Sequence, residues 1–153
     1  MRFISIFLAL LLATPVSAET TTATVAPPAI RLLHLKIAGH VLSAEVAHTQ
    51  ASRSQGLMHR QSMKKNHGML FVFPEIGRHS MWMVNTHIPL SIAFLDEKGV
   101  ILNIADMAPH TETAHSAAGA AKYAVETNFG WFRARGIKAG IRIMGLERAP
   151  VAE

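Results

Sequence analysis

Short apolar runs, some alternating with polar residues and some continuous, follow one another from residue 33 to residue 146. Leu33, Leu35 and Ile37 alternate with polar residues, which predicts a strand with one buried face. Residues 68–73 are continuously apolar and end at Pro74, which predicts a central strand with Leu70 and Phe71 buried on opposite faces. Similar runs predict strands over residues 41–47, 81–84, 90–95, 100–104, 122–126 and 141–146.

Only two short helices are predicted. Thr49 is a suitable N-cap for a helix over residues 50–58, and Asn128 is one for a helix that Gly136 stops. The strands follow one another too closely for repeated β–α–β units. Seven or eight short strands with one or two short helices therefore predict a mainly β fold, either a small β-sandwich or a barrel.

The N-terminal segment has the pattern of a secretory signal. Arg2 precedes eleven apolar residues, and Val16-Ser17-Ala18 is a small-residue cleavage signal. Eleven residues are too few to cross about 30 Å of hydrocarbon. We therefore expect cleavage near Ala18, a mature chain without a membrane span, and a secreted or periplasmic location. The predicted organisation is a signal peptide at 1–18, a flexible linker at 19–30, a folded domain at 31–148 and a tail at 149–153.

Composition removes several classes of function. The chain has 153 residues, 50% hydrophobic and 16% charged, which predicts one folded domain. It has no cysteine, so a disulfide scaffold, a cysteine-based zinc site and a thiol nucleophile are excluded. Basic residues are in excess over residues 122–148, but no aromatic residues interleave with them as a platform for bases. We interpret this region as a solvated surface and predict no nucleic-acid partner.

Three motifs carry a resemblance to a known family. They are Arg-Ser-Gln-Gly-Leu-Met-His-Arg at 53–60, Gly-Met-Leu-Phe-Val-Phe at 68–73 and Trp-Met-Val-Asn-Thr-His-Ile-Pro-Leu at 82–90. In this order and spacing they resemble the DUF192 family, also called UPF0127. Tyr-Ala-Val-Glu at 123–126 and Gly-Ile-Lys-Ala-Gly at 136–140 resemble its later motifs. The resemblance covers residues 35–144 and implies a small β-sandwich, frequent export, and a biochemical role that is not established.

The chain departs from the family pattern at a few positions. An aromatic residue is usual where Met81 stands, and aspartate is usual at Ser91 and frequent at Ile141. Any role that those aspartates have in relatives is therefore missing here. The loop at 109–121, which holds cysteines in many relatives, has none in this chain.

Trp82, Asn85 and Thr86 lie close together before Pro89, at the end of a predicted strand. As a functional group, Trp82 would line a pocket and the two polar side chains would orient a ligand. As a structural group, Asn85 and Thr86 would build the turn while Trp82 fills the core. The sequence leaves both interpretations open.

Arg53, Arg60 and Glu126 form a second candidate group. A buried arginine–glutamate pair would hold the first predicted helix against the sheet, because the guanidinium fork suits a bidentate carboxylate contact. An alternative function is hydrolysis of an envelope glycan or ester, with Glu126 as acid or base. A glycosidase needs a second carboxylate, for which Asp106 and Glu75 are available without any specific signal.

A further alternative is a Cu(I) site made by His79, Met81 and Met83. If residues 79–83 form one strand, these side chains share a face while Trp82 points to the other. Imidazole and thioether groups suit Cu(I), and His87 or Met58 would complete the set. Methionine also packs readily in irregular cores, which is the competing interpretation.

The leading hypothesis from the sequence is a non-enzymatic, exported module that binds a small molecule or another envelope component. It needs no cofactor, whereas the alternative copper-binding protein would need copper. The sequence does not determine the ligand, the partner or the oligomeric state. The expected ligand-binding residues are Arg53, Arg60, Trp82, Asn85, Thr86 and Glu126.

Overall fold

The computed structural model describes residues 32–153, which form the mainly β fold that the apolar pattern predicts. One α-helix, α1 (Gln50–Gln55), and two 3-10 turns, η1 (Arg133–Arg135) and η2 (Leu146–Arg148), accompany the strands. The predicted fold class is confirmed. The strands are β1 (Leu33–Ile37), β2 (His40–Ala47), β3 (His67–Gly77), β4 (Ser80–Met81), β5 (Leu90–Leu95), β6 (Ile101–Met107), β7 (His115–Ser116), β8 (Ala121–Asn128) and β9 (Ile143–Met144).

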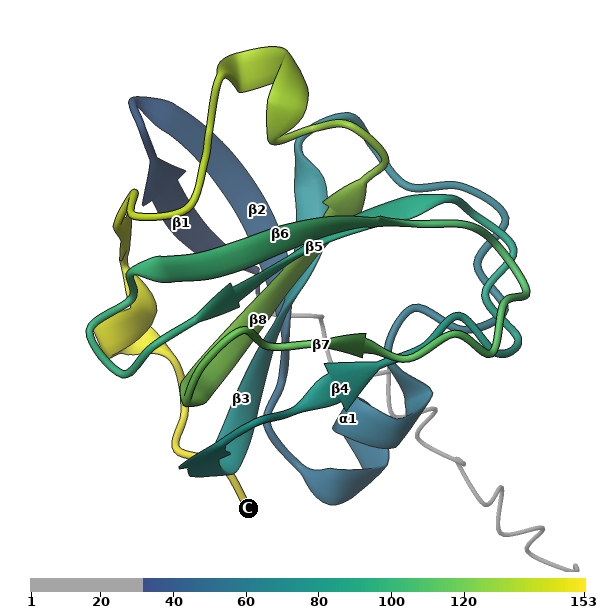
Figure 1. Cartoon of the computed structure of the whole chain (residues 1–153), viewed down its shortest axis with the longest axis horizontal. Coiled ribbons are helices and arrows are strands. Elements are labelled where there is room, and N and C mark those ends of the chain that lie inside the picture. Colours follow the sequence, from purple (N-terminus) through teal and green to yellow (C-terminus); the bar gives the residue numbers. More distant parts are fainter. Residues whose placement is uncertain (1–31) are drawn as a thin grey trace, which may run out of the picture.

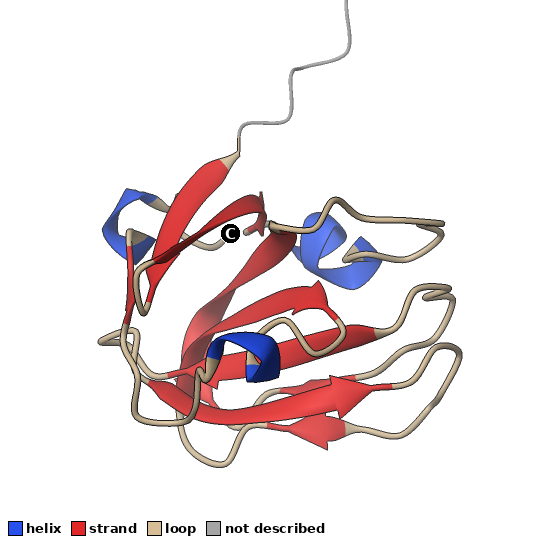
Figure 2. Ribbon diagram, turned by 90° about the horizontal axis from the view of Figure 1, so that it is seen from above, coloured by secondary structure: helices blue, strands red, loops and turns tan. Residues whose placement is uncertain are grey.

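Seven strands form one strongly curled sheet (Figures 1 and 2) in the order β6-β5-β8-β3-β2-β1-β9. Neighbours are antiparallel, except that β2 and β3 are parallel and are joined by a connection containing α1. The two ends of the sheet meet: the Ile101 amide donates to the Ile141 carbonyl (2.9 Å) and the Ile143 amide to the Gly99 carbonyl (2.8 Å). Backbone hydrogen bonds thus close the curl into a small barrel.

Each face of the sheet has its own apolar cluster. The inner cluster contains residues from all seven strands of the sheet together with Trp131 and Phe132, so it fills the inside of the curl. The outer cluster contains Phe71 and lies on the other face. Because successive strand residues point to opposite faces, Leu70 enters the inner cluster and Phe71 the outer one, both at most 1% exposed. The prediction for this central strand is confirmed.

The outer cluster is covered by α1, by the small sheet of β4 and β7, and by the loops next to them (Figure 1). Thr49 caps α1 as predicted, with its hydroxyl accepting from the Ser52 amide at 3.1 Å. Gly56 follows the helix so close to Phe71 that a Cβ there would lie 3.3 Å from the ring. A residue without a side chain therefore lets the helix pack directly on β3.

Several predicted boundaries are wrong. Strand β8 runs on to Asn128, and only the short turn η1 replaces the predicted second helix. The predicted strand over 81–84 is reduced to Ser80–Met81, and the last one to Ile143–Met144. In each case hydrogen bonding to neighbouring strands, rather than local propensity, decides the element.

The C-terminal end of the described part packs against the core. Ala149 and Ala152, in the segment expected to be a tail, pack against the inner cluster. The predicted signal peptide and linker lie outside the described residues. No helix within residues 32–153 is long and apolar enough to cross a membrane.

Candidate functional site

Glu126 is the residue around which the candidate site is built. It lies on β8 between Met69 of β3 and Ile92 of β5, its partners in register, and its side chain shares their outer face. The residue is 4% exposed. Gly68 allows this close packing of β3 and β8, because a Cβ at position 68 would clash with the Glu126 carbonyl oxygen. The Glu126 carboxyl group therefore stands between two apolar neighbours on the outer face of the sheet.

Burial raises the pKa of Glu126 to about 8, since the ionised carboxylate has lost its contact with water. No ion pair to Glu126 is formed within residues 32–153; the ion pairs there join other residues. The group is therefore mostly a neutral carboxylic acid at pH 7, by roughly ten to one. In that form it offers a hydroxyl donor and a carbonyl acceptor.

A cavity of about 600 Å³, which we call the Glu126 cavity, opens beside this carboxyl group. Phe71 and Phe73 of β3 form part of its apolar wall. Among its lining residues, Glu126 is the only carboxylate. The other lining residues are Gln50, Arg53, Ser54, Gln55, Gly56, Leu57, Met58, Pro74, His79, Ser80, Met81, Trp82 and Thr86.

Arg53 lines this cavity, and its guanidinium group holds α1 in place. Its guanidinium group donates to the carbonyls of His48, of Val72 at 3.2 Å and of Glu153 at 2.8 Å. The helix is thereby fixed to β3 and to the C-terminal segment. The expected pairing of Arg53 with Glu126 is not formed.

Arg60 lies elsewhere, in a bidentate ion pair with Glu45 of β2 at 2.6 and 2.7 Å. This pair contributes to a larger cavity of about 880 Å³ that is bordered by β1, β2 and α1. The Glu45 carboxylate in this cavity is already paired with the Arg60 guanidinium group, whereas Glu126 has no ion-pair partner within residues 32–153. We therefore place the candidate site at the smaller cavity.

The group of Trp82, Asn85 and Thr86 is divided by the structure. Trp82 lines the Glu126 cavity and is 58% exposed, and the buried Thr86 also lines it. Asn85 has a left-handed backbone (φ 55°) and its carbonyl accepts from the His59 amide at 2.9 Å, so it builds the turn. Four of the six residues expected to bind a ligand therefore share one cavity: Arg53, Trp82, Thr86 and Glu126.

The three residues proposed as copper ligands differ in their exposure. His79 and Met81 line the Glu126 cavity, while Met83 is 0% exposed within the outer cluster. The ring of His79 stacks on Phe73 with centroids 3.8 Å apart, and its Nε2 is 2.9 Å from the Glu75 carbonyl. Residues 79–83 do not form one strand, since β4 contains only Ser80 and Met81, so the shared strand face that the spacing predicted is not formed. Met81 packs against the outer cluster that contains Met83.

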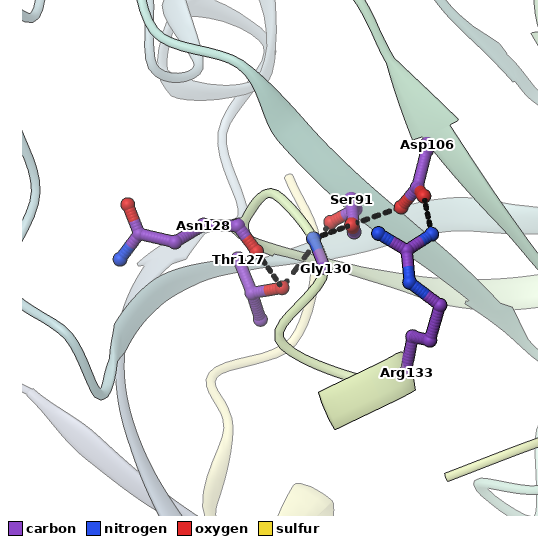
Figure 3. A network of polar contacts seen from close by, with 6 residues as sticks. All are labelled: Ser91, Asp106, Thr127, Asn128, Gly130 and Arg133. Carbon is purple, nitrogen blue, oxygen red and sulfur yellow. Dashed lines mark hydrogen bonds and ion pairs between the residues drawn. The ribbon is translucent and has the colours of Figure 1, made fainter. Parts of the chain in front are cut away.

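A polar network that sequence reasoning missed lies on the inner side of the sheet (Figure 3), buried at Ser91 and Thr127 and exposed at Asp106 and Arg133. The Ser91 hydroxyl donates to Asp106 across the β5–β6 pair and accepts from the Gly130 amide at 2.8 Å. Arg133 donates to the other oxygen of Asp106 at 2.6 Å. The Thr127 hydroxyl joins the network by donating to the Ser91 carbonyl at 3.5 Å, and it also donates to the Asn128 carbonyl at 3.2 Å. These contacts tie β5 and β6 to the η1 loop.

The fold and the cavity define a class of protein: a small, curled β-sheet domain with one buried carboxyl group in an outer cavity of mixed polar and apolar lining. The DUF192 family model, described as "Uncharacterized ACR", matches residues 33–145. The chain therefore belongs to the DUF192 family.

Two solved structures are similar over most of this chain. One, described as a candidate transcription regulator from Sinorhizobium meliloti, is 36% identical with a TM-score of 0.70, covering 74% of this chain and 92% of that one. The other, a protein of unknown function from Novosphingobium aromaticivorans, is 32% identical with a TM-score of 0.72, covering 83% and 99%. Comparison with the curated proteins finds no match.

Proposed function

We propose that this protein is an exported, non-enzymatic binding module whose Glu126 cavity holds a small molecule. The ligand would have an apolar body and one polar head group. The observation that carries the proposal is the Glu126 carboxyl group, buried without an ion-pair partner in residues 32–153 and facing a cavity. A carboxyl group buried without an ion-pair partner costs stability, and a ligand that hydrogen-bonds to it would offset that cost.

The walls define the ligand further. Phe71, Phe73 and Met81 offer apolar contacts, and the exposed Trp82 lies at the solvent side of the cavity. Polar residues, among them Thr86 and Glu126, line the same cavity. Apolar walls combined with a few oriented polar groups are the usual composition of a small-molecule site. A neutral head group would hydrogen-bond to the protonated carboxyl, whereas an amine would pair with its ionised form and release a proton.

Catalysis has less support. Glycoside hydrolysis requires two carboxyl groups, and the lining of the Glu126 cavity contains one. Regulation of transcription, the description of the Sinorhizobium relative, is not carried over to this chain. Within residues 32–153 the single α-helix has six residues, which is short for reading a DNA groove.

The test uses three probes that share one ring: benzyl alcohol, benzylamine and benzoate. Their binding is followed through the backbone amide signals of the ¹⁵N-labelled protein. We expect benzyl alcohol or benzylamine to shift the signals of residues 79–86 and 126, and benzoate to shift them least. Glu126→Leu should abolish these shifts by removing both polar atoms.

Glu97→Gln is the matched control, because Glu97 is exposed and lies outside the cavity. Its probe response should equal that of the wild type. Probe shifts that remain unchanged in Glu126→Leu, or a cavity that responds to none of the three probes, would contradict the proposed function.

A further inference from the structure

We propose that His59, His87 and His110 form a binding site for a borderline divalent cation such as Zn²⁺ or Cu²⁺. The three histidines lie on three separate loops and are all exposed. The rings of His87 and His110 have centroids 4.8 Å apart, and those of His59 and His87 6.2 Å apart. The site is distinct from the Glu126 cavity, so neither proposal depends on the other.

The distance between two ring nitrogens is the central observation. His87 Nδ1 and His110 Nε2 are 3.2 Å apart. Two nitrogens bound at 2.0–2.1 Å to one tetrahedral zinc ion are about 3.3 Å apart. Two neutral imidazoles at such a distance need either a shared proton or a shared cation between their facing nitrogens. The pair therefore already has the spacing of two ligands of one metal ion.

His59 supplies the third ligand by rotation of its side chain. In the present conformation no three His, Cys, Asp or Glu side chains within residues 32–153 are arranged to hold a metal ion. His59 is exposed, so its ring can turn without displacing core residues. Three imidazoles with one position left for water form a typical open zinc site.

The backbone holds the three loops together independently of any metal. The His59 amide donates to the Asn85 carbonyl at 2.9 Å, and the His110 amide donates to the Thr86 carbonyl at 3.2 Å. His59 and His110 both have left-handed backbones, with φ of 64° and 59°. Such conformations are uncommon outside glycine. Here they direct two histidines from distant parts of the chain to the loop that carries His87.

The donor set selects the class of cation. Neutral imidazole suits zinc, copper and nickel, while magnesium and calcium prefer oxygen ligands. All nine histidines of the chain lie within residues 32–153, so each can be tested by substitution. The residues just before His59 and His87 are Met58 and Thr86, which line the Glu126 cavity. The cation would thus sit on loops that border the proposed ligand site.

The test is calorimetric titration of the tag-free protein with Zn²⁺, repeated on single variants. We expect one saturable site per chain in the wild type. His87→Asn and His110→Asn should each weaken Zn²⁺ binding more than tenfold, because even residues that only orient a metal ligand account for roughly 10–100-fold. His59→Asn should weaken it measurably but less. Cu²⁺ electron paramagnetic resonance should show coupling to imidazole nitrogen that is lost in His87→Asn.

His34→Asn is the matched control, since His34 is an exposed histidine on β1. Its affinity for Zn²⁺ should equal that of the wild type. Metal-free melting temperatures identify any variant that fails to fold, and for such a position His→Gln replaces His→Asn. Absence of saturable Zn²⁺ binding, or an affinity unchanged in His87→Asn and His110→Asn, would overturn the site. An affinity unchanged in His59→Asn would overturn the three-histidine arrangement.

Discussion

At the scale of single residues, Glu126 is a carboxyl group whose burial lowers the stability of the fold and whose position faces the proposed ligand cavity. Its carboxyl group is buried between β3 and β5, and its pKa is raised to about 8 by loss of solvent. A carboxyl group buried between apolar neighbours without an ion pair does not improve the core. Binding of a ligand in the adjacent cavity accounts for a carboxyl group at this buried position better than packing does.

The raised pKa makes stability depend on pH. Glu126 is protonated in the folded protein up to about pH 8 but ionises near pH 4.5 in the unfolded chain. Its contribution is therefore fully present below pH 4.5 and is lost as the pH rises towards 8. We expect the free energy of unfolding of the wild type to fall over this range by a few kcal/mol relative to Glu126→Gln. Urea denaturation of the wild type and of Glu126→Gln at pH 5 and pH 8 measures this difference in free energy of unfolding. An equal pH dependence in the two proteins would contradict the raised pKa of Glu126.

Ser91 shows how one small hydroxyl joins three segments. It connects β5, Asp106 of β6 and the amide of Gly130. Ser91→Ala would leave the Gly130 amide and one Asp106 oxygen without this partner, so we expect a loss of about 1–3 kcal/mol in free energy of unfolding. Ser80→Ala is the control, because Ser80 is exposed on the small sheet, and it should cost about 0.5 kcal/mol or less. Denaturant melts that show similar losses for both would refute a special role for the network.

At the scale of elements, β3 and β8 form the centre of the molecule. Strand β3 pairs with β2 and β8, and β8 pairs with β3 and β5. Their inner residues fill the barrel, while their outer residues form the floor beneath α1 and the small sheet. The candidate site therefore rests on the most enclosed strands, and its walls come from short elements packed over them.

Phe71 tests this arrangement, since its ring is 1% exposed and contacts both the outer cluster and the α1 connection. Phe71→Ala should lower the free energy of unfolding by about 3–5 kcal/mol. Phe129→Ala, at a phenylalanine that is 50% exposed, should cost about 1 kcal/mol or less. Urea titrations compare the two variants. A loss below about 1 kcal/mol for Phe71→Ala would mean that the outer cluster is loosely packed.

At the scale of the whole molecule, the inner face of the curled sheet forms the core and the outer face carries the candidate site. The inner cluster supplies a closed core that includes residues of the C-terminal segment. The outer face carries the cavity, and the loops beside it carry the three histidines. The Glu126 cavity thus lies between the long strands β3 and β8 and the short segments packed over them, whereas the histidine site lies on loops alone.

Export is a prediction for the whole chain. The charged, apolar and small-residue regions of residues 1–18 are in the order of a cleaved signal. We expect the mature protein to begin at Glu19 and to occur outside the cytoplasm. Intact-mass spectrometry of the protein from its native cell, after fractionation, measures this. A full-length chain that retains Met1 in the cytoplasmic fraction would contradict it.

The sequence by itself determined the fold class and most strands, because alternation and unbroken apolar runs report local burial directly. The apolar run at 68–73 predicted the central strand, Thr49 predicted the start of α1, and the family motifs agreed with a mainly β fold. The boundaries at Asn128 and Met81 were missed, since pairing with distant strands decided them.

Only the tertiary structure decided which side chains meet. Arg60 pairs with Glu45 rather than Glu126, and Met83 enters the core although Met81 reaches the cavity. His59, His87 and His110 are 28 and 23 residues apart in sequence, so no local spacing could reveal their approach. Periodicity predicts which face of a strand is buried, but the path of the loops and the curl of the sheet bring remote residues to one place.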